Sequence, residues 1–257
     1  MGCCGTRDVF PSQRDQFQSE ELEGVIKEYE KQKRTLDLDK RAEGLEELDK
    51  EPRLVEDIEQ HAKDLAKWEG WTTEYEVEDM VLRSITEGKL APEVRVAYMQ
   101  VKFSQKATVE GVFKALEVPQ VRMQWDTTVL EMKETPPISR NTRVVYTAIN
   151  HVIFGRPKDF VEKKAVKRCE KDITVVCHST ENMVVAIQSF PEVQGRDRCT
   201  TVMCVYWIEA KEGVVTLRVV RQTDYKLPWI VNLFGVLGKT YLVTWMTQLK
   251  AAVETKS

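Results

Sequence analysis

The sequence contains 257 residues, of which 42% are hydrophobic and 31% are charged, and its 38 basic and 41 acidic side chains give a net charge of −3. This composition excludes a disordered polyelectrolyte and a bundle of membrane helices, and the length allows one large domain or two small ones. A dedicated nucleic-acid-binding protein is not expected either, because such proteins usually carry an excess of basic residues.

The cysteines indicate the redox environment of the chain. They do not form the evenly spaced pairs of small disulfide-rich secreted proteins. The N-terminus has no apolar run behind a basic start, and no Asn-x-Ser/Thr acceptor occurs. We therefore expect an intracellular protein with reduced thiols. The cysteines are Cys3, Cys4, Cys169, Cys177, Cys199 and Cys204.

The first residues match the pattern for N-myristoylation. Removal of Met1 exposes Gly2, and a hydroxyl residue follows at Thr6. One myristoyl chain binds a membrane weakly, with a constant on the order of 10⁴ M⁻¹, so stable attachment needs a second acyl chain. Cys3 and Cys4 are the candidates for palmitate. We expect a lipoprotein held on the cytoplasmic face of the plasma membrane or an endomembrane; the alternative is an ordinary tail in which these residues occur together by accident.

Residues 1–52 are predicted to form a charged extension that links the acyl anchor to a folded domain at residues 53–257. Leu22, Val25 and Ile26 follow a helical spacing, but the apolar face is sparse and interrupted by glycines. Such a helix is not stable by itself. The extension is therefore predicted to be a linker, and the alternative is a helix that binds a protein partner.

The body of the chain shows helical and strand periodicities. Apolar residues predict a helix over Val55–Glu69, with Trp68 on its apolar face and Gly70 as its end, and a short helix over Val109–Leu116. Several alternating or β-branched stretches are separated by short turns, which favours antiparallel pairing because parallel strands need a crossover. The predicted strands are Met80–Thr86, Val94–Phe103, Thr127–Met132, Arg143–Phe154, Phe160–Arg168, Ile173–His178, Cys199–Glu209 and Val214–Thr223.

The segment Leu227–Leu249 is strongly apolar and carries a single charge, Lys239. Its length suits a membrane-spanning helix. Its apolar side chains lie on one stripe, however, and its polar side chains gather away from that stripe, which is typical of a helix laid against a protein core. We expect such a helix over Leu227–Val253, with Pro228 in its first turn.

Four short sequence words accompany this order of elements: Arg122–Asp126, Val144–Tyr146, Pro157–Val161 and Pro228–Asn232. Their order and spacing resemble the START domain, and within it the phosphatidylcholine transfer protein subgroup. The resemblance implies an α+β helix-grip fold, in which a curved antiparallel sheet wraps around the long C-terminal helix and encloses one lipid in a tunnel. It covers about Arg53 to Glu254.

The resemblance also implies a function, which is non-enzymatic binding and transfer of a phospholipid or sterol. Together with the expected acyl anchor, it predicts a lipid-transfer domain tethered to a membrane. Exposing two acyl chains of about 30 CH₂ groups to water costs on the order of 24 kcal/mol, so a carrier must enclose them. The alternative is a lipid-sensing interaction or scaffold protein in which the bound lipid is structural or regulatory.

Lys164 is the first candidate for contact with the lipid. By resemblance it occupies a position where the family has an inward-pointing arginine, directed at the headgroup or at a buried acid. Lysine weakens a bidentate contact to a point charge. The strand expected opposite, at Tyr146–Ile149, lacks the acidic partner that the family pattern implies, so the sequence supplies no partner there for a buried ion pair. A solvated surface lysine is the alternative.

Four aromatic residues are candidates for the wall of the cavity or, through cation–π contact, for holding a quaternary ammonium group. Ordinary core packing is the alternative for each of them. They are Trp125, Tyr146, Tyr206 and Trp207.

The C-terminal helix is expected to be a lid that opens at a membrane and closes in solution. Core packing alone is the alternative. Its expected contacts with the lipid are Phe234, Leu237 and Tyr241. The expected contacts with the membrane are Trp229, Ile230 and, from the loop Glu181–Arg198, Phe190.

Motifs of catalysis are absent from the sequence. It has no Gly-x-Ser-x-Gly and no His-Glu-x-x-His. Gly235–Thr240 superficially resembles a phosphate-binding loop but lies inside the apolar helix, and the cysteine spacings form no zinc knuckle. We expect no enzymatic activity, no metal and no cofactor other than lipid cargo.

Overall fold

The computed structural model describes residues 52–85, 91, 94–150, 155–179, 190–227 and 236–255. The chain divides into two units, Met1–Lys40 and Arg41–Ser257. Every described residue belongs to the second unit, and the fold is therefore that of the second unit alone.

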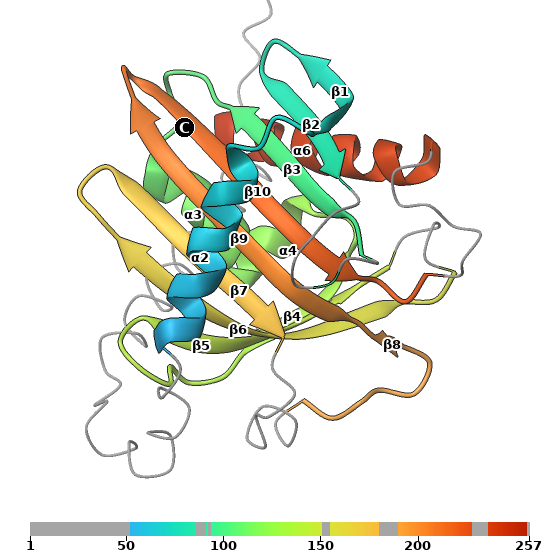
Figure 1. Ribbon diagram of the computed structural model, residues 1–257. Coiled ribbons are helices and arrows are strands. Elements are labelled where there is room, and N and C mark those ends of the chain that lie inside the picture. The colour runs from blue at the N-terminus through green and yellow to red at the C-terminus, as the bar shows by residue number, and fades with distance from the viewer. Residues whose placement is uncertain are drawn as a thin grey trace, which may run out of the picture. The chain divides into compact units, whose positions relative to one another are not determined.

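Within the described residues, ten strands form one sheet, in the order β1-β2-β3-β10-β9-β7-β6-β5-β4 (Figure 1). All neighbours along this path are antiparallel, and the two-residue β8 pairs in parallel with β6. The sheet is open, with β1 and β4 at its ends. The strands are β1 (Thr72–Val77), β2 (Met80–Ile85), β3 (Val96–Lys102), β4 (Val129–Glu134), β5 (Thr142–Ile149), β6 (Lys158–Arg168), β7 (Asp172–Ser179), β8 (Asp197–Arg198), β9 (Thr200–Lys211) and β10 (Val214–Asp224).

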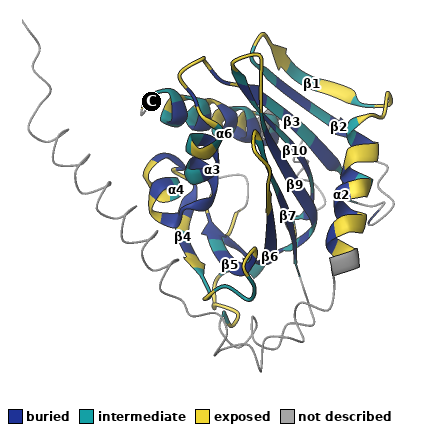
Figure 2. Cartoon of the chain, turned by 90° about the vertical axis from the view of Figure 1, so that its left-hand side faces the viewer, coloured by how far each residue is buried: buried dark blue, intermediate teal, exposed yellow. Residues whose placement is uncertain are grey.

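Helices cover both faces of the sheet (Figure 2). Helix α2 (Pro52–Ala66) lies on one face, which we call the outer face. Helices α3 (Val109–Glu117), α4 (Pro119–Trp125) and α6 (Val236–Thr255) lie on the other, the inner face. The predicted α+β class with an antiparallel sheet and a C-terminal helix is confirmed.

Strand alternation separates the two faces. On β9, Tyr206 and Ile208 belong to the hydrophobic cluster shared with α3, α4 and α6. Their neighbours Val205 and Trp207 belong to the cluster under α2. Because successive side chains of a strand point to opposite faces, β9 divides its residues between these two clusters.

Helix α2 packs on the outer face through Ile58, Ala62 and Leu65, all of which are buried. It ends at Ala66, four residues before Gly70. The placement of Trp68 on the apolar face was therefore wrong: Trp68 is 46% exposed, beyond the end of the helix. The indole of Trp71 instead donates a hydrogen bond to the carbonyl of Leu65 at 2.9 Å, which satisfies one carbonyl at the C-terminal end.

Helix α6 packs on the inner face with the predicted stripe. Tyr241, Leu242, Met246 and Leu249 are buried, at the i, i+1, i+5 and i+8 positions of one side of the helix. Residues 228–235, the first part of the predicted helix, lie outside the described residues. No helix in the described part of the chain is long and apolar enough to cross a bilayer.

The sequence analysis missed β1, α4 and the two-residue β8, which lies in the predicted loop Glu181–Arg198. Strand β1 carries two glutamates among few apolar residues, and helix α4 is seven residues long, too short for periodicity to be recognised. Strand β4 begins two residues later than predicted, at Val129. Helix α3 begins after Thr108, whose hydroxyl accepts a hydrogen bond from the Gly111 amide at 3.0 Å.

Candidate functional site

Charged side chains form a buried network on the inner face. Glu117, at the C-terminal end of α3, is completely buried. Its carboxylate accepts hydrogen bonds from Arg143 Nη2 at 2.9 Å and from Lys164 Nζ at 3.2 and 3.3 Å. Arg143 of β5 and Lys164 of β6 are direct partners in the antiparallel register, so the sheet brings both cations to one carboxylate.

The structure corrects the prediction for Lys164. The residue is 2% exposed, so it is not a surface lysine, and it takes part in a buried ion pair for which the opposing strand offered no acid. The acid comes from helix α3 and not from the neighbouring strand. The pKa of Lys164 is raised: burial acts to lower it, and the negative charges around it, Glu117 first among them and Glu162 also, together outweigh that effect.

Glu162 of β6 continues the network along the inner face. Its carboxylate accepts a hydrogen bond from the Thr201 hydroxyl at 2.6 Å. It also lies 3.9 Å from Lys164 Nζ and 3.7 Å from Arg221 Nη2. Burial acts to raise the pKa of Glu162, but Lys164, Arg221 and the Thr201 hydrogen bond lower it below its ordinary value. The carboxylate is therefore ionised at neutral pH.

Arg221 of β10 is the most accessible cation of this group. Its side chain keeps 23% of its surface accessible. Burial acts to lower the pKa of Arg221, but the groups around it, Tyr225 first among them, raise that pKa well above its ordinary value. The guanidinium lies over the rings of Phe160 and Tyr225, 5.5 and 5.7 Å from their centroids. Its Nε donates a hydrogen bond to the Thr223 hydroxyl at 2.8 Å. Arg221 therefore packs against two aromatic rings while part of its side chain stays accessible.

A second ion pair lies at the end of α4, and a hydrogen bond connects it to α6. Arg122 lies 2.9 Å from Asp126 through Nη2 and donates to it through Nε at 3.0 Å. The guanidinium lies 5.4 and 5.5 Å from the ring centroids of Trp125 and Trp245. The indole of Trp245, on α6, donates to Asp126 at 3.1 Å. One carboxylate therefore holds an arginine of α4 and a tryptophan of α6.

The structure divides the predicted aromatic residues between the two faces. Trp125, Tyr206 and Tyr241 lie in the inner-face cluster. Trp207 packs under α2 on the outer face. Tyr146 lies in a separate small cluster with Val144 of its own strand and Val161 of β6. Tyr146 and Trp207 therefore do not join the other three.

The hydroxyl of Tyr146 takes part in polar contacts with two charged residues. Its hydroxyl lies 3.2 Å from Asp159 Oδ2 and accepts a hydrogen bond from Arg196. Its ring stacks on Phe190 with a centroid separation of 5.3 Å. Phe190, a predicted membrane contact, is thus half-buried against Tyr146 in the structure.

The remaining predicted contacts lie outside the described residues. These are Gly2, Cys3, Cys4, Trp229, Ile230 and Phe234. Leu237 lies within α6, but its side chain is not among those described.

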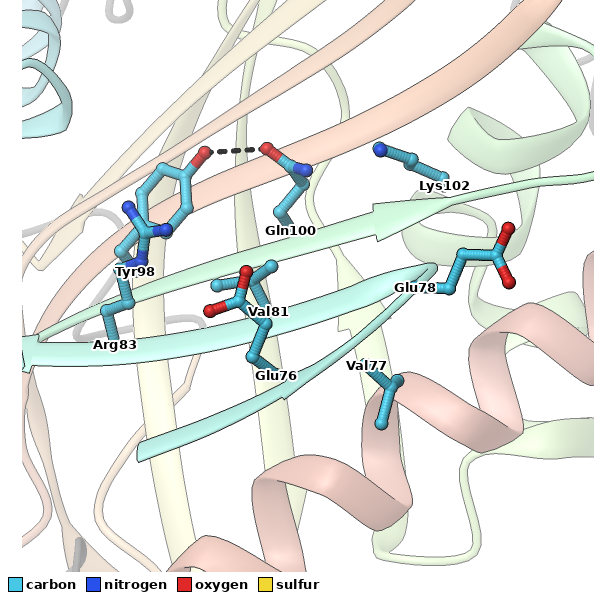
Figure 3. Close-up of a pocket in the computed structure, with 8 residues that line it drawn as sticks. All are labelled: Glu76, Val77, Glu78, Val81, Arg83, Tyr98, Gln100 and Lys102. Atoms are coloured by element: carbon cyan, nitrogen blue, oxygen red, sulfur yellow. Dashed lines mark hydrogen bonds between the residues drawn. The ribbon is translucent and has the colours of Figure 1, made fainter. Parts of the chain in front are cut away.

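A groove of about 470 Å³ lies on strands β1, β2 and β3 (Figure 3). Its lining includes Glu76, Glu78, Arg83 and Lys102, and the Tyr98 hydroxyl donates to Gln100 within it at 2.9 Å. Tyr98 packs against the outer-face cluster, so the groove lies on the side of the sheet away from α6. Its charged lining is unsuited to hydrocarbon.

Glu117, Glu162, Arg122 and Arg221 were not singled out from the sequence. Two of them carried a recognisable signal, which is a charge inside an apolar run. Glu117 follows Ala115 and Leu116, and Arg221 follows two valines of a strand. A charge at such a position is buried only when it has a partner or a function.

A family model decides the family. The model of the START domain matches residues 55–255, which is most of the chain and nearly all of the described fold. The chain belongs to the START domain family. Lipid-binding and lipid-transfer proteins occur among START homologues. No curated protein sequence matches the chain.

Solved START structures share this fold. Human StAR-related lipid transfer protein 5 is 19% identical, with a TM-score of 0.65 over 79% of this chain and 96% of that one. Human STARD10 is 13% identical, with a TM-score of 0.65 over 77% and 78%. The human StarD13 (DLC2) lipid transfer and protein localization domain is 19% identical, with a TM-score of 0.59 over 78% and 96%. At these identities the similarity establishes the START fold alone.

Proposed function

We propose that this START protein binds one phospholipid or sterol between the inner face of the sheet and α6, and transfers it between membranes without catalysis. The observation that carries the proposal is the buried polar network of Glu117, Lys164, Glu162 and Arg221 inside an otherwise apolar cluster. An amphiphile needs both parts: an apolar surround for hydrocarbon and a few polar groups that fix the headgroup.

The inner-face cluster supplies the apolar part. It combines strands β2 to β10 with α3, α4 and α6, and includes the rings of Phe113, Trp125, Phe160 and Tyr241. Enclosure is required because each CH₂ group left in water costs roughly 0.8 kcal/mol. We propose that the chain is related to the phosphatidylcholine transfer protein subgroup, because it shares short sequence words with that subgroup. We do not assign phosphatidylcholine as its lipid.

We propose further that acylation tethers the protein to the cytoplasmic face of a membrane. The support is the sequence: Gly2 and Thr6 match the myristoylation pattern, and Cys3 and Cys4 offer thiols for a second chain. Two acyl chains give the membrane residence that one does not. Metabolic labelling with a myristate analogue tests this: label is expected on the wild type and not on Gly2→Ala, and absence of label on the wild type rejects the tether.

Vesicle-to-vesicle transfer tests the main proposal. A chain without residues 1–52, which carry the proposed anchor, is incubated with donor vesicles that contain a fluorescent phospholipid or sterol. Fast transfer to acceptor vesicles is expected. A chain that holds lipid but exchanges it slowly supports the alternative, a lipid-sensing interaction protein. A chain that holds no lipid, by native mass spectrometry and in this assay, rejects both functions.

Two lysines of one strand provide a paired comparison for the transfer assay. Lys164→Met changes the buried network, whereas Lys167→Met changes a half-exposed side chain that pairs with Glu59 of α2 on the outer face. The proposal predicts altered lipid retention for the first variant and wild-type retention for the second. Equal behaviour would place the network outside the binding site.

A further inference from the structure

Arginines already cover aromatic rings of the inner face. Arg122 lies over Trp125 and Trp245, and Arg221 lies over Phe160, at centroid distances of 5.4 to 5.5 Å. A quaternary ammonium group binds to aromatic faces that are free of other cations. At these rings it would lie beside a guanidinium ion and be repelled by it. These three rings are therefore poorly suited to a choline headgroup.

Arg122 and Arg221 differ in how many of their guanidinium nitrogens donate hydrogen bonds within the protein. Arg122 directs Nε and Nη2 at Asp126, and its Nη1 donates to the Leu116 carbonyl at 3.3 Å. Arg221 has its Nε on Thr223, and Nη2 is 3.7 Å from Glu162, which is too far for a hydrogen bond. Within the described part of the chain, the terminal nitrogens of Arg221 make no hydrogen bond.

The other cations of the network are better paired than Arg221. Arg143 and Lys164 share the buried carboxylate of Glu117 at hydrogen-bond distance. Glu162, the carboxylate nearest to Arg221, already accepts from Thr201. Because the side chain of Arg221 is 23% accessible and Glu162 is too far for a hydrogen bond, its terminal nitrogens can donate to a bound acceptor with negative charge.

Arg221 also faces the proposed lid. Its guanidinium lies over the ring of Tyr225, which belongs to the same hydrophobic cluster as Tyr241 of α6, and it acts to lower the pKa of Tyr241 against the effect of burial. Tyr225, which follows β10 in the chain, covers the guanidinium from the same region. A headgroup bound at Arg221 would therefore lie between β10 and α6, with its acyl chains along the apolar inner face.

We propose that Arg221 binds the anionic headgroup of the lipid cargo, a phosphate monoester or a carboxylate, through its terminal nitrogens. The proposal rests on the proposed function, lipid binding at the inner face. Guanidinium forms paired hydrogen bonds with both kinds of anion, and such charged bonds are stronger than neutral ones. Phosphatidic acid carries a phosphate monoester and a long-chain fatty acid carries a carboxylate, so these two lipids represent the two kinds of headgroup.

Binding of three lipids to the full-length, unacylated protein tests the proposal. Dioleoyl phosphatidic acid, oleic acid and dioleoyl phosphatidylcholine are each presented at equal concentration, and bound lipid is measured by native mass spectrometry and by competition with a fluorescent fatty acid. The wild type is expected to prefer phosphatidic acid or oleic acid to phosphatidylcholine by about tenfold or more, the difference of one charged hydrogen bond. The preferred anion identifies the source of the headgroup.

Two arginines of the same strand provide the variants. Arg221→Gln is expected to lose the anionic preference, with affinity for phosphatidylcholine unchanged. Arg218→Gln, which alters a half-exposed arginine paired with Glu209, is expected to bind as the wild type does. Arg221→Lys keeps the charge without the paired donors, and its preference for anionic lipid is expected to lie between that of the wild type and that of Arg221→Gln.

The outcomes separate this proposal from the proposed function. A wild type that prefers phosphatidylcholine, or an Arg221→Gln variant that keeps the anionic preference, overturns the anionic headgroup site and leaves lipid binding intact. A wild type that binds none of the three lipids overturns lipid binding and the headgroup site together. If Arg221→Gln does not fold, the wild-type preference and the Arg221→Lys variant still decide.

Discussion

Lys164 of β6 donates to Glu117 at the end of α3 from 47 positions further along the chain, at 3.2 and 3.3 Å. Arg143 of β5 donates to the same carboxylate at 2.9 Å. The three side chains join the helix pair α3–α4 to the sheet at a place where the carboxylate has no exposed surface. Removal of one member therefore leaves charge that water does not reach.

Loss of this carboxylate is expected to be costly. Glu117→Gln leaves Arg143 and Lys164 buried without their shared anion, and breaking a buried pair from one side costs about 3–5 kcal/mol. The free energy of unfolding in urea measures the effect. Glu110→Gln, on the same helix, removes an exposed pair with Arg168 and is expected to cost less than about 1 kcal/mol. Similar losses in the two variants would contradict the role of the buried network.

The sequence predicted the parts of the fold that periodicity determines. The alternation in β5, β6, β9 and β10 and the stripe of α6 are properties of single elements, and they were found within a few residues. The Glu117–Lys164 pair is a contact between a helix and a strand, which no local pattern encodes. The search for a partner of Lys164 was confined to the neighbouring strand and therefore failed.

One error in the predicted site was avoidable. Tyr206 and Trp207 are consecutive residues of one strand, so both cannot point to the same face. Tyr146 needed the register of β5, which the sequence alone does not give: Val145 points to the inner cluster, and Tyr146 to the opposite side. The burial of Arg221 was signalled by its apolar neighbours, but its contacts with Phe160 and Tyr225 depend on the sheet and on the turn after β10.

Acid is expected to weaken the inner-face network through Glu162. Its pKa is lowered in the folded state, so the stabilisation is present above the unfolded value, about 4.3, and is lost as the pH falls through the lower folded value. Unfolding in urea between pH 7 and pH 3 compares the wild type with Glu162→Gln. The wild type is expected to be more stable at pH 7, and the difference is expected to shrink below pH 4. A constant difference over this range would show that Glu162 is not ionised in the folded protein.

Thiol reactivity is expected to distinguish the described cysteines by burial. Cys169 is exposed, whereas Cys177, Cys199 and Cys204 are buried, and burial raises the pKa of Cys199 to about 12. In a Cys3→Ser/Cys4→Ser protein, one thiol is expected to react with a chromogenic disulfide in buffer, and all four are expected to react in urea. Cys169→Ser is expected to abolish the reaction in buffer.

Rapid modification of Cys199 in the folded protein, identified by peptide mass spectrometry, would contradict the buried position of this thiol.

The same experiment tests whether bound lipid shields the inner face. Cys177 and Cys204 lie opposite each other on β7 and β9, and both belong to the inner-face cluster. If lipid fills the space beside them, its removal is expected to speed their modification and leave that of Cys169 unchanged.

The indole of Trp245 is expected to restrain α6. It donates to Asp126 at 3.1 Å and thereby ties the helix to the loop after α4. Trp245→Phe removes this donor and keeps an aromatic ring, so α6 is expected to open more often, because a net hydrogen bond to a charged group contributes about 1.5–3 kcal/mol. Faster amide hydrogen exchange in Val236–Thr255 and faster lipid transfer between vesicles are the expected results.

Trp71 provides the comparison on the opposite face. Its indole donates to the Leu65 carbonyl at 2.9 Å, at the end of α2. Trp71→Phe removes a similar donor, and it is expected to speed exchange near the end of α2 while leaving α6 and the transfer rate unchanged. If both variants accelerate transfer equally, general loss of stability explains the effect. If Trp245→Phe alone accelerates exchange in α6 but not transfer, movement of α6 does not limit the release of lipid.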